Sequence, residues 1–462
     1  MGRKLLRAGK WTLFVLAALL ALSPFILVVL AGQAEERLDE ALKQIAATGD
    51  PVEMTQLAKP PIPDEQNAAL VYRQAFDEMA EAELSEEERK FIRDIAFGEV
   101  RLDDPVIAAQ AEGILRRNKR ALELVHQAVE MPECDFQRDW SKGMFLLYPE
   151  FAKLRECSRL LSFESMMLLH AGRVDEAVGA CSTNFRLCNA ADEPSLIGQL
   201  VGYAIIAIAS RPLSAILRDS QPSSEVCLSI AEEIRGIELI PGYIEAMKGE
   251  RTLGRSAFNV VRSDPDPIRG LAELSVPLEE STPRKAGKHP AGKAPGMNSF
   301  VKWWLASDEL TYLELMGRVI REASLPYREV ISIEPSVDEE VGSLRNISLP
   351  PRVITAILMP VFSRAQMKRD GAIAQLRLAE VSLLLKAYKA ERGIYPGSLA
   401  ELEKFVGRAL PEDPASGEAL VYHREGEGFL LYSWGYDLED DGGEPPAPGR
   451  YEESDIVIQC VH

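Results

Sequence analysis

The spacing of apolar and polar positions divides the chain into segments with different periods. An almost unbroken apolar run extends from Trp11 to Ala31, and about 20 such residues cross a bilayer as one helix. From residue 36 to residue 261, apolar residues recur at intervals of three and four between Pro, Gly and Asp, which is typical of amphipathic helices. We therefore expect a transmembrane helix (residues 11–31) followed by an α-helical domain (residues 36–261).

The clearest helical unit is a hairpin of two helices between Pro149 and Ala191, with a turn at residues 170–173. The order Gly172-x-x-x-Glu176-Ala177 resembles one hairpin of the tetratricopeptide type. No clean recurrence at a fixed period accompanies it. The pattern thus favours an irregular α-helical bundle or an irregular array of α-hairpins over true repeats.

The helical pattern fails between residues 262 and 297. The run Asp264-Pro265-Asp266-Pro267 opens a Pro-rich stretch, and residues 282–295 are poor in apolar side chains, so we expect a flexible linker. A helical continuation covers residues 298–349. Within it, Trp303 and Trp304 are expected in a core, because they are far along the chain from the spanning segment.

The last segment, residues 350–462, combines a long helix with short strands. The helix places an apolar face toward a sheet and Gln375, Arg377, Lys386 and Lys389 away from it. Residues 420–423 and 429–432 flank turn glycines and predict a β-hairpin, and residues 455–461 predict a third strand. The expected unit is α+β, with one long helix on a small antiparallel sheet.

Three short motifs in this segment carry a resemblance to a known family. They are Gly393-Ile394-Tyr395-Pro396, the Asp413-Pro414 step, and Trp434-Gly435-Tyr436-Asp437. Together they resemble the globular domain of the type II secretion major pseudopilin, over about the last quarter of the chain. The resemblance implies a pseudopilin-like α+β domain at residues 350–462, and hence a multidomain protein.

The same resemblance implies a calcium site in the acidic, Gly-rich loop that starts at Asp437. It assigns ligand roles to Asp437 and Asp455, with Asp440 and Asp441 as further candidates inside the loop. Crowded carboxylates suit calcium, which accepts six to eight oxygen ligands with loose geometry. The sequence departs from the family at Leu438, where a glycine is common, and in an insertion at residues 445–448. A simply solvated acidic loop is the alternative.

Charge around the spanning segment predicts its orientation. Arg3, Lys4, Arg7 and Lys10 precede it, whereas Glu35 and Glu36 follow, and basic flanks favour the cytoplasmic side. We expect a cytoplasmic tail (residues 1–10), a single pass through the inner membrane, and a periplasmic C-terminal bulk. A cleaved signal peptide before Gly32-Gln33-Ala34 is the competing interpretation, although its apolar region is normally only about 7 to 15 residues long.

The composition limits the kinds of partner that we expect this protein to bind. A net charge of −19 argues against nucleic acid, which is itself polyanionic. Six cysteines in an oxidising compartment permit disulfides. Cys157 is within reach of Cys181 or Cys188 on a neighbouring helix, and buried free thiols are the alternative.

No catalytic motif is present in the sequence. The five histidines show no ligand spacing, and neither a nucleophile elbow nor a phosphate-binding loop occurs. We therefore expect a membrane-anchored extracytoplasmic binding or scaffolding protein whose C-terminal domain binds calcium. The alternative is an extracytoplasmic hydrolase with its active site in the helical domain, marked by a pocket that pairs His126 or His170 with a carboxylate. A third possibility is a peripheral subunit of a secretion system.

Overall fold

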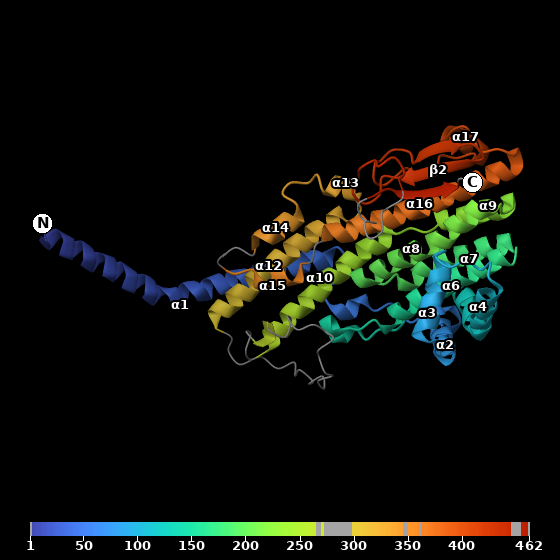
Figure 1. Cartoon of the computed structure of the whole chain (residues 1–462). Coiled ribbons are helices and arrows are strands. Elements are labelled where there is room, and N and C mark those ends of the chain that lie inside the picture. The colour runs from blue at the N-terminus through green and yellow to red at the C-terminus, as the bar shows by residue number, and fades with distance from the viewer. Residues whose placement is uncertain are drawn as a thin grey trace.

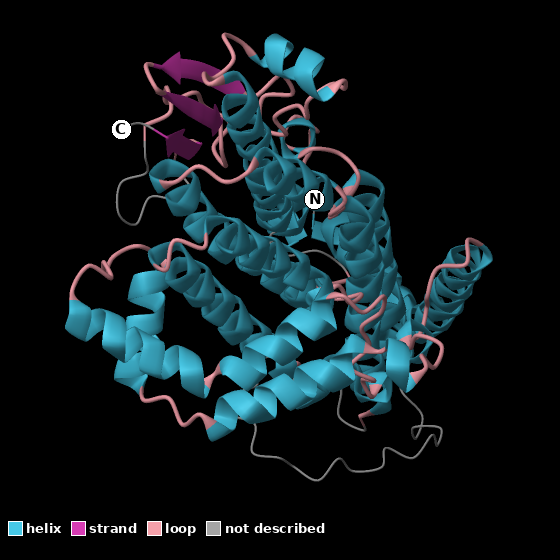
Figure 2. Cartoon of the chain, turned by 90° about the vertical axis from the view of Figure 1, so that its right-hand side faces the viewer, coloured by secondary structure: helices cyan, strands magenta, loops and turns pink. Residues whose placement is uncertain are grey.

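A computed structural model describes residues 2–264, 269–271, 298–344, 350–359, 362–444 and 454–460, apart from the side chains of residues 2–23. The chain is mostly helical, with a small three-stranded antiparallel sheet near its C-terminus. In Figure 1 the long helices run alongside one another, and the N-terminal half of α1 extends away from them. Figure 2 shows the sheet at one edge of the helical body.

The regular elements in the first part of the chain are all helices, joined by loops and turns. Its elements are α1 (Gly2–Ala47), η1 (Met54–Leu57), η2 (Asp64–Gln66), α2 (Ala68–Glu81), α3 (Glu86–Ala96), α4 (Pro105–Arg117), α5 (Lys119–Val129), η3 (Trp140–Phe145), α6 (Pro149–His170), α7 (Val174–Arg186), η4 (Leu187–Ala191), α8 (Leu196–Asp219), α9 (Ser224–Arg235) and α10 (Ile240–Ser263).

The second half adds helices and then the strands. Its elements are α12 (Ser299–Glu322), α13 (Tyr327–Val330), α14 (Val337–Leu344), α15 (Val353–Leu358), α16 (Phe362–Arg392), α17 (Leu399–Val406), β1 (Val421–Glu425), β2 (Gly428–Ser433) and β3 (Ile456–Cys460). Most of the predicted linker, at residues 265–268 and 272–297, lies outside the described residues.

The predicted α6–α7 hairpin is confirmed. Its turn is built on Gly172, whose φ of 73° is the left-handed conformation that glycine adopts without a steric penalty. The Arg173 N–H donates to the Leu168 carbonyl and the Gly172 N–H to the Leu169 carbonyl, both over 2.9 Å. These two bonds satisfy the last carbonyls of α6 and end it sharply.

The predicted hairpin and terminal strand are also confirmed. The strands lie in the order β1-β2-β3, and both pairs are antiparallel. Val421 is opposite Tyr432 in the first pair, and Ser433 is opposite Ile456 in the second. The central strand β2 is buried along its whole length.

The long helix α16 packs on the sheet as expected, but its opposite face is also covered. Helices α8 and α9 lie against it. Lys386, which was expected to point away from the sheet, is buried there by these neighbours: it is 3% exposed, and its Nζ donates to the Ser220 carbonyl at the end of α8 over 2.9 Å. One hydrophobic core runs from α2 through α9 to α16 and the sheet, across the predicted boundary at residue 350.

Among the residues whose side chains are described, α8 is the one helix that is long and apolar enough to cross a membrane. It packs against α6, α7 and α16, and 56% of its most apolar stretch is buried. Sequence analysis did not single out this helix. Its apolar composition fits a position inside the body, where neighbouring helices cover it on several sides.

Helix α1 consists of two halves with different surroundings. Ala34 and Leu38 are buried against α12 in a second hydrophobic core, and Ala31, one turn earlier, is also buried. Before them, Phe25 and Val28 are 69% and 57% exposed. Most side chains of the predicted spanning segment (residues 11–31) lie outside the described part of the chain.

Candidate metal centre

The acidic loop and Asp455 lie at one end of the sheet. The loop begins just after β2, whose last residue, Ser433, is paired with Ile456, the first residue of β3. Asp455 immediately precedes β3. The antiparallel pairing therefore returns Asp455 to the end of β2 where the loop starts, as the sequence predicted.

The start of the loop is held in place where Gly435 packs against the backbone at Ser454 and where the Tyr436 ring packs against Gly371. Gly435 has a φ of 71°, and a Cβ there would lie 2.3 Å from the Ser454 carbonyl oxygen, so only glycine fits. The Tyr436 ring covers Gly371 of α16, where a Cβ would lie 1.9 Å from a ring carbon. Gln375 donates to the Tyr436 hydroxyl over 3.2 Å.

Asp413 is a positioning residue that sequence reasoning did not assign. It is 1% exposed, and its carboxylate accepts hydrogen bonds from Ser433 Oγ at 2.6 Å and from the Trp434 N–H at 3.2 Å. It also accepts from the N–H groups of Ala415 and Ser416 in its own turn. The Asp-Pro step was the available signal, because aspartate before a turn commonly bonds the backbone that follows it.

Asp455 is the most unusual carboxylate of this region. It is 2% exposed, and its Oδ2 accepts the Gly443 N–H over 2.7 Å. Its Oδ1 is buried without a hydrogen-bond partner. Burial raises the pKa of Asp455; the N–H groups of Gly443 and Asp441 oppose this, and the charges of Asp440 and Asp441 raise it further.

The other candidate ligands are distributed unevenly around Asp455. Asp440 and Asp441 are near enough for their charges to act on it. Asp440 Oδ1 also accepts the Gly442 N–H over 2.9 Å and the Tyr432 hydroxyl over 3.1 Å. Asp437 instead closes its own turn by accepting the Glu439 N–H over 3.2 Å. Asp440 and Asp441, the further candidates in the sequence, are thus the ones grouped with Asp455.

Leu438 stands where the resemblance led us to expect glycine, and its backbone has a glycine-like conformation. Its φ is 68°, in the left-handed region that is uncommon for any residue other than glycine, asparagine or aspartate. The backbone therefore follows the path that a glycine would take. Across the described residues, no group of three or more His, Cys, Asp or Glu side chains is arranged so that it could hold a metal ion.

The histidine that the hydrolase alternative invoked does have a carboxylate partner. His126 Nε2 lies 2.7 Å from Glu164 Oε2, and Nδ1 lies 3.1 Å from Thr183 Oγ1. These contacts join α5, α6 and α7, and the His126 side chain is 37% exposed. Both ring nitrogens are occupied within the helical body.

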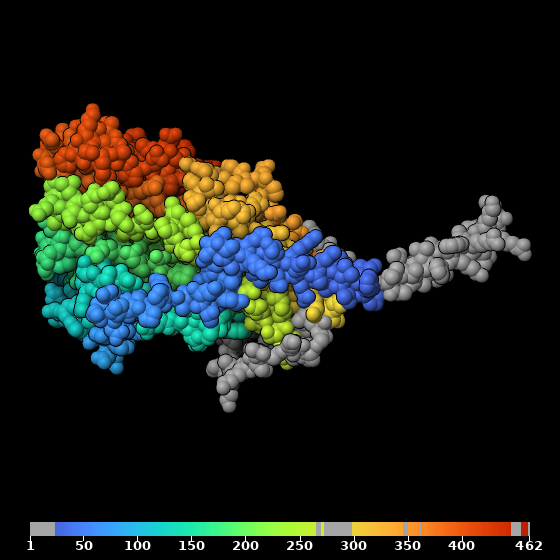
Figure 3. All heavy atoms as spheres, turned by 180° about the vertical axis from the view of Figure 1, so that it is seen from behind, coloured from blue at the N-terminus to red at the C-terminus, as the bar shows by residue number. Residues whose placement is uncertain are grey.

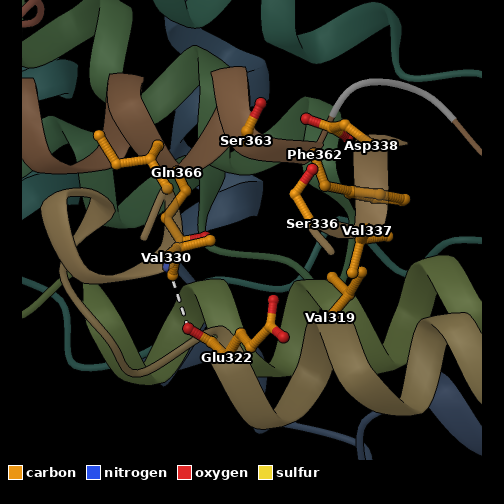
Figure 4. A pocket seen from close by; sticks show the side chains of 10 residues that line it. Val319, Glu322, Val330, Ser336, Val337, Asp338, Phe362, Ser363 and Gln366 are labelled. Carbon is orange, nitrogen blue, oxygen red and sulfur yellow. Dashed lines mark hydrogen bonds between the residues drawn. The ribbon is translucent and has the colours of Figure 1, made fainter. Parts of the chain in front are cut away.

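Two cavities in the described structure have different linings. One, of about 150 Å³, lies between α12, α13, α14 and α16 (Figure 4), where Gln366 Nε2 donates to the Glu322 carbonyl over 3.0 Å. The other, of about 60 Å³, lies beside α3 and α6. Neither lining includes His126 or His170.

All six cysteines are free thiols. Cys134 is half-buried and the other five are buried, so the alternative of buried free thiols matches the structure. Burial raises the pKa of Cys157, Cys181 and Cys188 to about 12. Such thiols are poor nucleophiles at neutral pH.

Comparisons with protein-family models, with curated proteins and with solved structures give no match to this chain.

Proposed function

We propose that this chain is a single-pass membrane protein whose extracytoplasmic body, with a pseudopilin-like C-terminal part, serves as a binding or scaffolding platform at the cell envelope. One observation carries the proposal: α1 is continuous from residue 2 to residue 47 and changes from exposed apolar side chains to core side chains at Ala31. Exposed side chains such as Phe25 and Val28 need an apolar environment outside the body.

The continuity of α1 has a mechanical consequence. Because Ala34 and Leu38 are buried against α12, the body is joined to the proposed spanning segment by an uninterrupted helix. Such a connection holds the body at a set distance and tilt relative to the bilayer. A rigidly mounted body suits a platform that presents one surface to partners in the envelope.

Reporter fusions test the placement. A reporter that is active only outside the cytoplasm, fused after His462, should be active, and a cytoplasm-only reporter should be silent. Activity of the cytoplasmic reporter would reverse the proposed orientation. Release of a shortened chain from washed membranes would indicate a cleaved signal peptide instead of an anchor.

We also propose that Asp455, with Asp440 and Asp441, binds calcium and thereby stabilises the C-terminal part. The orphaned, buried Oδ1 of Asp455 supports this, because an unpaired carboxylate oxygen is costly to bury. The side-chain donors are all oxygens, as calcium prefers, and calcium commonly completes its shell with main-chain carbonyls and water. Its role would be structural.

The calcium proposal predicts a metal-dependent melting temperature for the full chain in detergent. Calcium should raise it relative to a chelator, because the ion binds the folded state and not the unfolded chain. Asp455→Asn should abolish the rise, and Asp440→Asn should weaken it. Glu439→Gln, which removes one exposed charge from the same loop, should leave the rise intact. An equal melting temperature with and without calcium in the parent would refute the site.

The hydrolase alternative rests on the contacts of His126 with Glu164 and Thr183. It predicts that His126→Ala abolishes an ester- or peptide-cleaving activity while the chain stays folded. We favour the platform, because the lining of neither described cavity contains His126.

A further inference from the structure

We infer that the end of the body from which α1 emerges lies in the lipid headgroup layer. Its contact surface, here called the exit face, consists of Phe300, Lys302 and Trp303 of α12 and Val353 of α15. This inference rests on the proposed membrane anchor. It adds that the body itself contacts lipid, so that the anchor is not the only attachment.

The first step concerns position along α1. Lys302 Nζ lies 3.7 Å from Glu35 Oε1, which places the start of α12 beside the point where α1 enters the body. Figure 1 shows α1 and α12 running in the same direction from that end, and Figure 3 shows the start of α12 near the same end from behind. At 1.5 Å per residue, Phe300 lies about 3 Å nearer the membrane than Lys302, close to the level of Gln33 and about 3 Å beyond Ala31, where the proposed spanning segment ends.

This arrangement changes the interpretation of the two tryptophans. The expectation that they lie in a core because they are distant from the spanning segment holds for Trp304, which is 8% exposed and donates its Nε1–H to the Pro351 carbonyl over 2.8 Å. Trp303 also packs against the second hydrophobic core, but it is only half-buried. Although about 270 residues separate it from α1 in the sequence, the pairing of α12 with α1 places it at the membrane-proximal end.

The second step concerns the chemistry of the exit face. Phe300 is 41% exposed and Val353 is 37% exposed. Val353 lies beside the first half of α12, because the Pro351 carbonyl accepts the Trp304 Nε1–H and the Ile354 N–H donates to Asp308. The Phe300 and Trp303 rings meet edge to face, with centroids 5.9 Å apart, and the Lys302 side chain between them in sequence is 44% exposed. Aromatic rings beside a lysine are typical of membrane interfaces, where the rings reach the acyl boundary and the ammonium meets phosphate.

The third step identifies lipid rather than protein as the occupant. Phe25, Ile26, Val28 and Val29, the exposed apolar residues of α1, lie on the stretch of α1 that precedes its contact with α12 at Glu35. The headgroup region of one leaflet is about 5 to 8 Å thick, and Phe300 lies within that distance of the end of the proposed spanning segment, because α12 packs against α1. A protein partner there would have to displace lipid that the anchor already holds in place.

Site-directed spin labelling of the full chain in phosphatidylcholine–phosphatidylglycerol liposomes tests the inference. Nitroxides are attached to Phe300→Cys and, as a second site, Val353→Cys. Val28→Cys reports on the anchor, and Val106→Cys, 75% exposed on α4, is the aqueous control. The native cysteines are mostly buried and should label weakly. Collision rates with oxygen and with a water-soluble nickel chelate give the depth of each label.

We expect labels at residues 28, 300 and 353 to collide more with oxygen than with nickel, and the label at residue 106 to show the reverse. If residue 28 is in lipid while residues 300 and 353 are as accessible to nickel as residue 106, the exit face does not contact lipid and the anchor stands. If residue 28 is also aqueous, the proposed anchor itself fails.

Discussion

Two buried carboxylates a short distance apart in the fold illustrate what a single residue can reveal. Asp413 accepts four hydrogen bonds, from Ser433, Trp434 and the turn that follows it, so its buried charge is compensated. Asp455 is equally buried but has one oxygen without a partner. A buried carboxylate whose oxygens all accept hydrogen bonds is stabilised by the fold alone. A buried carboxylate with an unpaired oxygen, in a loop of other carboxylates, suggests a cation as the missing partner.

Asp455 should make the metal-free protein less stable as pH rises. Its pKa is raised above 3.8 in the folded state, so between 3.8 and the raised value the folded state binds more protons than the unfolded chain. The free energy of unfolding therefore falls as pH increases through that interval, and the penalty is complete above it.

Asp455→Asn removes this penalty, because the neutral amide does not ionise. In chelator, we expect the variant to be more stable than the parent at pH 7 and this advantage to shrink as pH falls toward 4. Urea unfolding across that range measures the difference. If the difference in unfolding free energy between variant and parent does not vary with pH, ionisation of Asp455 is not its cause. With calcium added, the parent should become the more stable of the two proteins.

At the scale of elements, α1 and α16 show that a sequence can predict a helix correctly without predicting which elements pack around it. The apolar face of α16 was expected to meet one sheet, yet α8 and α9 cover the other side and bury Lys386. Burial lowers the pKa of this lysine. The periodicity of one helix indicates which face is apolar. It does not reveal that other helices pack on the opposite face, where a polar side chain can be buried if its polar atom is hydrogen-bonded.

The two halves of α1 should respond differently to truncation of their side chains. Leu38→Ala opens a cavity between α1 and α12, and core substitutions of this type typically cost about 2 to 5 kcal/mol. Val28→Ala removes a side chain that is 57% exposed and should leave the stability of the body within about 0.5 kcal/mol of the parent. Chemical unfolding in detergent compares the two variants. Equal losses of unfolding free energy in the two variants would mean that α1 does not change from an exposed to a core helix at Ala31.

At the scale of the whole molecule, the body is held together by contacts between distant parts of the sequence. The core that contains α2, α6 and α8 also contains α16, β2 and β3. The Arg408 guanidinium, near the sheet, pairs with Glu232 of α9 over 2.8 Å. Residues 350–462 therefore share their hydrophobic core with the helical domain.

This shared core predicts that an isolated 350–462 fragment folds poorly. Removing α8 and α9 would expose the face of α16 that they cover, and exposed apolar surface costs about 25 cal/mol per Å². We expect low protection of α16 amides in hydrogen exchange of the fragment and strong protection in the full chain. A fragment as well protected as the full chain would show that residues 350–462 form an independent domain.

The sequence alone determined the local elements of this protein. Apolar periodicity and turn residues were enough for the α6–α7 hairpin, the long helix and the three strands, because these signals act between residues close together in the chain. The acidic residues around Asp455 were likewise evident from composition and from a family resemblance.

Tertiary structure decided the environment of those elements. It buried Lys386, grouped Asp440 and Asp441 with Asp455, and set the start of α12 beside α1 at Glu35. Each of these outcomes depends on which distant segments become neighbours. The pattern within one segment records that it has an apolar face, and only the packing of the whole chain determines what covers that face.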